Sequence, residues 1–152
     1  MKQTTLCYIE KDGAYLMLHR VKKKNDENHD KWVGIGGKLE YAETPFDCIR
    51  REAREEVGLL LNALRYAGII TFVSDLYGTE YMHLFHCSDF SGELPDECDE
   101  GVPRWVLKEK IKDLPIWEGD KIFLNLLDSE KRFFSLKLVY EGDKLVSHTL
   151  EF

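Results

Sequence analysis

The chain has 152 residues, of which 43% are hydrophobic and 32% are charged, and its formal net charge at pH 7 is −7. This composition is that of an ordinary water-soluble globular protein, and the length predicts a single domain over residues 1–152. The negative charge argues against stable binding to nucleic acid or to an anionic membrane surface. No apolar stretch approaches the ~20 residues of a membrane-spanning helix, and the first residues have no apolar signal core. We therefore expect a cytoplasmic protein.

Alternating apolar residues and turn signals predict a chain that is rich in strands. Hairpin turns are expected at Lys11-Asp12-Gly13 and at Gly142-Asp143. The predicted strands are 4–10, 14–19, 65–74, 80–88, 104–107, 133–141 and 144–152. Helices are predicted over 45–57 and 120–127, with a short helical turn over 108–114, and the polar stretch 21–31 is a loop of a length that is usually functional. Many strands with two principal helices predict an α+β fold in which helices pack on a mixed sheet.

The signals for the first of these helices are complete at both ends. Thr44 is a good N-cap residue, Pro45 suits the first helical position, and Asp47 stands where the acid of a capping box would. Gly58 is a natural residue to end the helix in a left-handed conformation. The helix is therefore expected to run from residue 45 to residue 57.

Three carboxylates, Glu52, Glu55 and Glu56, crowd the last turns of this helix. The helix macrodipole disfavours negative charge near that end, and like charges four residues apart cost roughly 0.2–0.5 kcal/mol more. At ~100° per residue the three side chains occupy one arc beside the apolar stripe. A divalent cation would compensate both penalties. The alternative is an ordinary surface helix with Asp47–Arg51 and Arg51–Glu55 ion pairs.

The stretch 37–59, which reads GKLEYAETPFDCIRREAREEVGL, resembles the Nudix box, G-x5-E-x7-R-E-U-x-E-E-x-G-U, where U is an apolar residue. Every specified position is filled at the right spacing. The matching residues are Gly37, Glu43, Arg51, Glu52, Ala53, Glu55, Glu56, Gly58 and Leu59. By contrast, GIGGK at 34–38 matches neither the dinucleotide-binding fingerprint nor the P-loop.

The resemblance implies the Nudix fold, an α/β/α sandwich with a mixed sheet, and hydrolysis of a nucleoside diphosphate linked to another group. It implies Mg²⁺ as the cofactor, with Mn²⁺ as the other candidate, and such hard cations prefer oxygen ligands. The implied metal ligands are Gly37 through its carbonyl, Glu52, Glu55 and Glu56, with Glu56 the firmest. Arg51, Glu52 and Glu56 are the implied catalytic residues, and the resemblance does not decide which carboxylate is the general base.

Further motifs resemble the MutT-like branch of this family, which includes enzymes that hydrolyse oxidised purine nucleoside triphosphates such as 8-oxo-dGTP. These motifs include Trp32-x-Gly34-x-Gly36, Pro103-x-Trp105 and Trp117-x-x-Asp120. The likeness implies Glu100 as an additional metal-binding or water-positioning carboxylate. The implied substrate-binding residues are Lys23, Val33, Phe72, Trp117 and Asp120.

Each of these side chains also has an ordinary structural explanation. Glu100 and Lys23 could be solvated loop residues, and Phe72 and Trp117 could be plain core aromatics. Asp120 could be an acid that the dipole favours in the first turn of a helix. The sequence alone leaves these alternatives open.

At two positions this sequence differs from the MutT-like branch, and both positions concern recognition of the base. Val33 stands where a mammalian member has a base-reading asparagine, and Gly119-Asp120 stands where that member has two aspartates. Buried hydrogen bonds decide such specificity by orders of magnitude, so the preferred base stays open.

The leading hypothesis is a metal-dependent (deoxy)nucleoside triphosphate pyrophosphohydrolase that binds a small nucleotide and is a monomer or homodimer. A second hypothesis keeps the chemistry and changes the substrate to a nucleotide sugar or a dinucleotide. A third is a Nudix-fold module that binds a nucleotide without turnover, against which the intact box carboxylates argue. An RNA-cap hydrolase is disfavoured because the chain has no basic extension.

Overall fold

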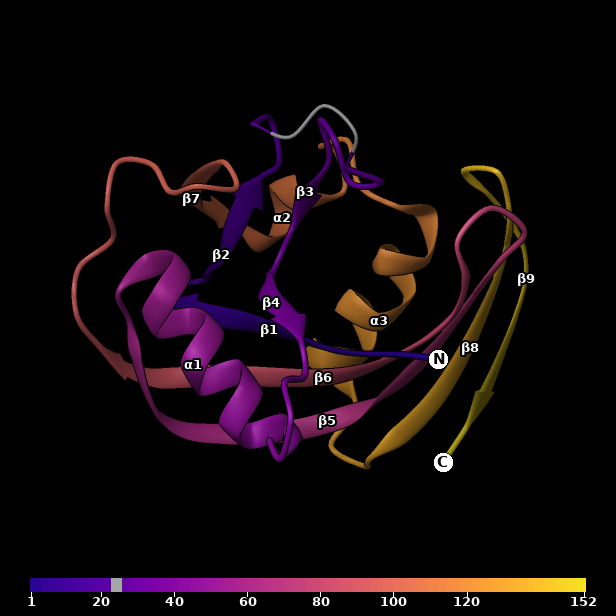
Figure 1. Ribbon diagram of the computed structural model, residues 1–152, viewed down its shortest axis with the longest axis horizontal. Coiled ribbons are helices and arrows are strands. Elements are labelled where there is room, and N and C mark those ends of the chain that lie inside the picture. The colour runs from indigo at the N-terminus through magenta and orange to yellow at the C-terminus, as the bar shows by residue number, and fades with distance from the viewer. Residues whose placement is uncertain (23–25) are drawn as a thin grey trace.

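The computed structural model describes residues 1–22 and 26–152, and these residues form nine strands and three helices around one mixed sheet (Figure 1). The strands are β1 (Lys2–Lys11), β2 (Ala14–His19), β3 (Trp32–Val33), β4 (Ile35–Lys38), β5 (Leu60–Ser74), β6 (Gly78–Ser91), β7 (Val102–Leu107), β8 (Phe134–Glu141) and β9 (Lys144–Glu151). The helices are α1 (Pro45–Val57), α2 (Lys108–Ile111) and α3 (Glu118–Ser129). None of the described helices is long and apolar enough to cross a bilayer.

The sheet has the strand order β3-β2-β1-β6-β5-β8-β9, with β4 paired to β1 and β7 paired to β2. Two of the pairings, β1 with β6 and β5 with β8, are parallel, and the others are antiparallel. Parallel partners need a long connection between them, and here the connections carry the other strands and the helices. The prediction of an α+β fold with a mixed sheet is confirmed.

Helices cover both faces of the sheet, and the side chains of β1 alternate between the two cores that the helices help to form. In β1, Leu6 and Tyr8 belong to one hydrophobic cluster, which also contains Phe123 of α3. Their neighbours Cys7 and Ile9 belong to the other cluster, to which α1 contributes Ile49, Ala53 and Val57. In Figure 1, α1 lies to the left of β4 and α3 lies to its right. This is the helix–sheet–helix layering that the resemblance implied.

Helix α1 has the bounds and caps that its sequence predicts. The Thr44 side chain accepts a hydrogen bond from the backbone N–H of Asp47, and the Asp47 carboxylate accepts one from the backbone N–H of Thr44. Gly58 ends the helix with a φ of 67°, a left-handed conformation that glycine adopts without strain. These signals are local in sequence, which is why they are readable without the fold.

Five elements extend beyond the bounds that their sequence patterns predict, namely β1, β5, β6, β7 and α3. Strand β5 starts at Leu60, directly after α1, whereas the alternation predicted a start at residue 65, and β6 extends to Ser91. Register shifts lie between Leu61 and Gly68, and each one breaks the period of two that reveals a strand in sequence. Helix α3 starts at Glu118 instead of residue 120.

Candidate active site

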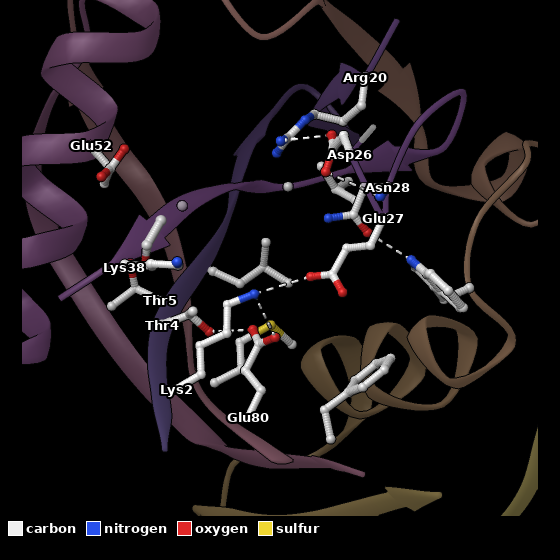
Figure 2. Close-up of a pocket in the computed structure, with 18 of the residues that line it drawn as sticks. Lys2, Thr4, Thr5, Arg20, Asp26, Glu27, Asn28, Lys38, Glu52 and Glu80 are labelled. Atoms are coloured by element: carbon white, nitrogen blue, oxygen red, sulfur yellow. Dashed lines mark hydrogen bonds and ion pairs between the residues drawn. The ribbon is translucent and has the colours of Figure 1, made fainter. Parts of the chain in front are cut away.

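A cavity of about 400 Å³ opens between α1, the start of β1, the loop after β2, and the start of α3 (Figure 2). Most of the site residues that the sequence predicts line this single cavity. They are Val33, Gly37, Glu52, Glu56, Phe72, Glu100, Trp117 and Asp120. Glu55 and Arg51 instead line an adjoining surface hollow that shares Glu52, Glu56 and Glu100 with the cavity. Lys23 lies outside the described residues.

Arg51 ties the carboxylate face of α1 to the glycine loop that precedes the helix. Its Nε and Nη2 donate to the two carboxylate oxygens of Glu43 at 2.7 and 2.9 Å, and its Nη2 also donates to the carbonyl of Lys38 at 3.1 Å. Its Nη1 donates to Glu52 at 2.8 Å and to Glu55 at 3.3 Å. The guanidinium holds the pKa of Glu43 well below its ordinary value, at about 2. One cation therefore orients three carboxylates of the box.

Glu52 packs directly against the loop at Gly37. A Cβ on residue 37 would lie 2.5 Å from the carboxyl carbon of Glu52, so a side chain at this position would displace the carboxylate. Behind the loop, Thr5 Oγ1 donates to the Gly37 carbonyl at 3.4 Å, and Cys48 Sγ lies 3.7 Å from the same oxygen. The requirement for glycine in the first box position thus has a steric reason in this chain.

Glu56 is half-buried, and one of its carboxyl oxygens is fully buried. Its Oε2 has no hydrogen-bond partner among the described residues. Burial, then the contact with Glu52 and the charge of Glu100, raise the pKa of Glu56 far above its ordinary value. A buried oxygen that lacks a partner and faces other carboxylates is an arrangement that a cation would stabilise.

The carboxylates do not stand together as a finished coordination shell. Within residues 1–22 and 26–152, no group of three or more His, Cys, Asp or Glu side chains has the spacing of a metal site. Arg51 holds Glu52 and Glu55 at the edge of the helix, and the Glu55 side chain is 59% exposed. Glu55 is thus the predicted ligand that lies farthest out toward solvent.

Glu100 enters the cavity from the loop between β6 and β7. Its Oε2 forms an ion pair with Arg20 Nη1 at 3.1 Å, and Arg20 Nη2 pairs with Asp26 at 2.8 Å. The arginine therefore connects Glu100 to the loop that follows β2. Glu100 lies in the wall of the cavity and is not a freely solvated loop acid.

The opposite end of the cavity is aromatic. Trp117 is 7% exposed, belongs to the core, and meets Phe72 edge-on with ring centroids 5.9 Å apart. Its indole N–H donates to Asn28 Oδ1 at 2.7 Å, and the Lys31 ammonium lies 4.7 Å from the ring centroid. Trp117 is therefore both a core residue and part of the cavity wall, so the two alternatives for it are not exclusive.

Asp120 lies beside this aromatic end and is 5% exposed. Burial raises the pKa of Asp120 to about 8, although the charge of Lys31 acts in the opposite direction. A side chain on the preceding residue, Gly119, has no room, because its Cβ would lie 2.6 Å from Leu138 Cδ1 and 2.8 Å from the Tyr140 hydroxyl. The absence of a second acid next to Asp120 therefore follows from the packing of α3 on β8.

Further polar residues of the cavity carry no motif, and sequence reasoning missed them. They include Lys2, Thr4, Glu27, Asn28 and Glu80. Only Glu27 and Asn28 had a signal, as members of a polar loop of functional length. Lys2 and Glu80 are far apart in sequence and meet through the parallel pairing of β1 with β6.

The NUDIX domain family profile matches residues 2–127. The chain belongs to the NUDIX family. It is 34% identical over 153 residues to the oxidized purine nucleoside triphosphate hydrolase of Danio rerio, a match that covers 99% of this chain and 94% of that protein. The enzyme of the same name from Mus musculus is 30% identical over 131 residues, which cover 84% of this chain and 82% of the relative.

The crystal structure of a MutT protein from Bacillus halodurans is similar over nearly the whole fold. Its TM-score is 0.87 at 25% sequence identity, and the match covers 99% of this chain and 98% of that one. With the family profile and the relatives, this likeness confirms the predictions of a Nudix hydrolase, of its MutT-like branch and of its fold.

Proposed function

We propose that this Nudix protein hydrolyses nucleoside triphosphates, in a reaction that depends on a divalent metal and releases the monophosphate and pyrophosphate. The observation that carries the proposal is the cavity itself, which joins the box carboxylates Glu52 and Glu56 to the aromatic pocket of Phe72 and Trp117. A nucleotide needs both ends, because its phosphates require a cationic centre and its base requires an apolar surface. The names of the Danio rerio and Mus musculus relatives support a purine as the base.

The residues of the phosphate end suit a hard cation. The available donors are all oxygens, from the Gly37 carbonyl, Glu52, Glu56 and Glu100, with Glu55 close by. The unsatisfied Oε2 of Glu56 and its neighbouring carboxylates make the site unfavourable without positive charge. When bound, Mg²⁺ or Mn²⁺ supplies charge neutralisation for the phosphate oxygens and activation of a water molecule. We propose Mg²⁺ as the working ion.

The chain supplies the orientation of the reacting groups. Arg51 fixes Glu52 by a hydrogen bond at 2.8 Å, and Glu43 fixes Arg51 in turn through two hydrogen bonds. Glu52 therefore has a defined position at the loop, where it orients the attacking water or accepts its proton. Preorganised geometry of this kind lowers the activation barrier because no reorganisation is needed at the moment of reaction.

The aromatic end holds the base. Stacking of a base on an aromatic side chain is worth about 1–3 kcal/mol, and Trp117 is held in place by its bond to Asn28. Asp120 has a pKa of about 8 and is therefore mostly protonated at neutral pH, so its carboxyl group both donates and accepts hydrogen bonds. Val33 contributes only apolar surface.

A hydrolysis panel with identified products tests this function. The purified protein is incubated with Mg²⁺ and with ordinary and oxidised dNTPs, NTPs, nucleotide sugars and dinucleotides, in parallel with samples that contain EDTA. We expect monophosphate and pyrophosphate from one or more triphosphates, and no turnover with EDTA. Faster cleavage of a nucleotide sugar or dinucleotide than of any triphosphate would contradict the proposal and favour the second hypothesis. Binding without any turnover would favour the non-catalytic module.

Three further expectations stay predictions. They are the single domain over residues 1–152, the cytoplasmic location, and the monomeric or homodimeric state.

A further inference from the structure

A charged cluster stands at the aromatic end of the cavity (Figure 2). Lys2 Nζ lies 3.1 Å from Glu27 Oε1 and 3.5 Å from Glu80 Oε1. Thr4 Oγ1 donates to the other oxygen of Glu80 at 2.6 Å. Two carboxylates thus share one ammonium group, and the three side chains carry a net charge of about −1 at neutral pH.

The sheet register places this cluster beside the proposed base pocket. Glu80 on β6 pairs with Lys2 on β1 and with Phe72 on β5, so the three side chains project from the same face. The neighbour of Glu27 in the loop, Asn28, accepts the indole N–H of Trp117. Lys2 and Glu80 therefore lie within reach of the edge of a base that rests against Phe72 or Trp117.

Both groups keep unused hydrogen-bonding capacity. An ammonium group has three N–H donors, and the described contacts of Lys2 employ two of them. A carboxylate can accept about four hydrogen bonds, and the described contacts of Glu80 are those from Thr4 and Lys2. One donor of Lys2 and about two acceptor positions of Glu80 are thus available to a ligand.

We propose that Lys2 and Glu80 form a base-reading pair that selects the Watson–Crick edge of guanine. The Glu80 carboxylate accepts from the N1–H and the N2 amino group, and the Lys2 ammonium donates to O6. This pair supplies the base-edge contacts that Val33 and Gly119 cannot make, and it rests on the proposed function of the cavity. The same edge is present in 8-oxoguanine, so ordinary and oxidised guanine nucleotides are read alike by this pair.

Other bases do not complement the pair. Adenine and cytosine present a ring-nitrogen acceptor where guanine presents N1–H, and this acceptor would face the Glu80 carboxylate. Thymine and uracil offer one N–H between two carbonyl oxygens, one of which would face the carboxylate. A buried polar group that faces the wrong partner costs orders of magnitude in kcat/KM.

Single substitutions test directly whether Lys2 and Glu80 recognise guanine. Glu80→Gln places an amide where the carboxylate accepts two hydrogens, and Lys2→Met keeps the side-chain length without the donor. We expect each variant to lower kcat/KM for dGTP and 8-oxo-dGTP at least about tenfold, and to change kcat/KM for dATP and dCTP by less than about threefold. Glu130→Gln, which breaks the remote ion pair with Arg132, serves as the matched control and leaves the base ratios unchanged.

A charge exchange separates base reading from simple structural support. The double variant Lys2→Glu/Glu80→Lys retains an ion pair between the two strands, so a structural role predicts recovery of the wild-type ratios. A base-reading role predicts that the preference for guanine stays lost while the melting temperature recovers. Guanine preference at the wild-type level in the double variant, or in both single variants, would overturn the proposal.

Binding measurements keep this test separate from the proposed function. Calorimetric titration with dGMP and dAMP measures base preference without turnover, so it applies even if the protein hydrolyses none of the triphosphates. We expect wild-type protein to bind dGMP at least about tenfold more tightly than dAMP, and the Glu80→Gln variant to lose this difference. Equal affinities in the wild-type protein would overturn the base-reading pair and leave the hydrolytic proposal in place.

Discussion

Glu52 lies so close to Gly37 that a methyl group on residue 37 would stand 2.5 Å from the Glu52 carboxyl carbon. The contact joins the first residue of the Nudix box to one of its central carboxylates. Arg51 holds Glu52 on the other side, so the carboxylate cannot retreat without breaking that hydrogen bond. The glycine loop and helix α1 therefore hold the Glu52 carboxylate in one position between them.

Gly37→Ala should therefore impair catalysis far more than folding. The added Cβ displaces the Glu52 carboxylate, and a misplacement of about 1 Å in a catalytic group can cost about 100-fold in rate. We expect kcat/KM to fall by at least this factor and the Mg²⁺ concentration for half-maximal activity to rise, while the melting temperature changes by only a few degrees. Steady-state kinetics with a Mg²⁺ titration measures the effect, and wild-type kinetics in the variant would contradict it.

Glu56 and Glu55 should differ sharply in importance, although both are box carboxylates. Glu56 lines the shared cavity and has a buried Oε2, whereas Glu55 is 59% exposed and paired with Arg51. We expect Glu56→Gln to abolish Mg²⁺-dependent turnover, and the matched Glu55→Gln to lower kcat/KM only about 10- to 100-fold. Circular dichroism would verify that both variants fold. Equal losses of activity in the two variants would contradict this ranking. Unchanged turnover in Glu56→Gln would contradict the proposed metal site.

The Glu43–Arg51 pair should contribute stability that depends on pH. The pKa of Glu43 is lowered to about 2 in the folded protein from an ordinary value of 4.5, so its contribution is complete above that ordinary value. It declines as the pH falls from about 4.5 toward 2. We expect Glu43→Gln to lower the free energy of unfolding by about 1–2 kcal/mol at pH 7 and by less at pH 3. Urea unfolding at several pH values measures this, and a pH-independent difference would argue against the ion pair.

Asp120 should make a contribution to stability whose pH dependence is opposite to that of Glu43. Its pKa is raised from 3.8 to about 8 in the folded protein, so folding is most favourable below the ordinary value and weakens as the pH rises toward 8. Asp120→Asn removes this dependence, and we expect the variant to gain stability relative to wild type between pH 5 and pH 8. Glu118→Gln, in the same helical turn but exposed, is the control and should follow the wild-type curve. Parallel curves for wild type and Asp120→Asn would show that Asp120 is ionised throughout.

Trp117 should affect substrate binding more than the chemical step. Loss of ~1–3 kcal/mol of stacking corresponds to a rise in KM of about 5- to 150-fold, which we expect for Trp117→Leu with a smaller change in kcat. Trp117→Phe keeps an aromatic face and loses the hydrogen bond to Asn28, so a smaller rise in KM is expected. If kcat falls more than KM rises in the leucine variant, Trp117 supports the catalytic geometry instead of the base.

Local spacing along the chain predicted the helix that carries the proposed metal-binding carboxylates, and it predicted a Nudix hydrolase. Thr44, Asp47 and Gly58 cap α1 through contacts within a few residues, and the Nudix box is one uninterrupted stretch. Local spacing carries all of this information, because helical caps and carboxylate arcs depend only on neighbours along the chain. The same stretch, residues 37–59, also predicted the Nudix family.

The surroundings of the proposed base pocket depend on contacts that form only in the folded sheet. Lys2 and Glu80 face each other because β1 and β6 pair in parallel with one particular register, and a shift of one residue would turn each side chain to the other face. Gly119 excludes a second acid because Leu138 and Tyr140 of β8 fill the space over it. These contacts join segments that lie far apart in the chain, and their register is set by how the whole sheet packs between its two cores.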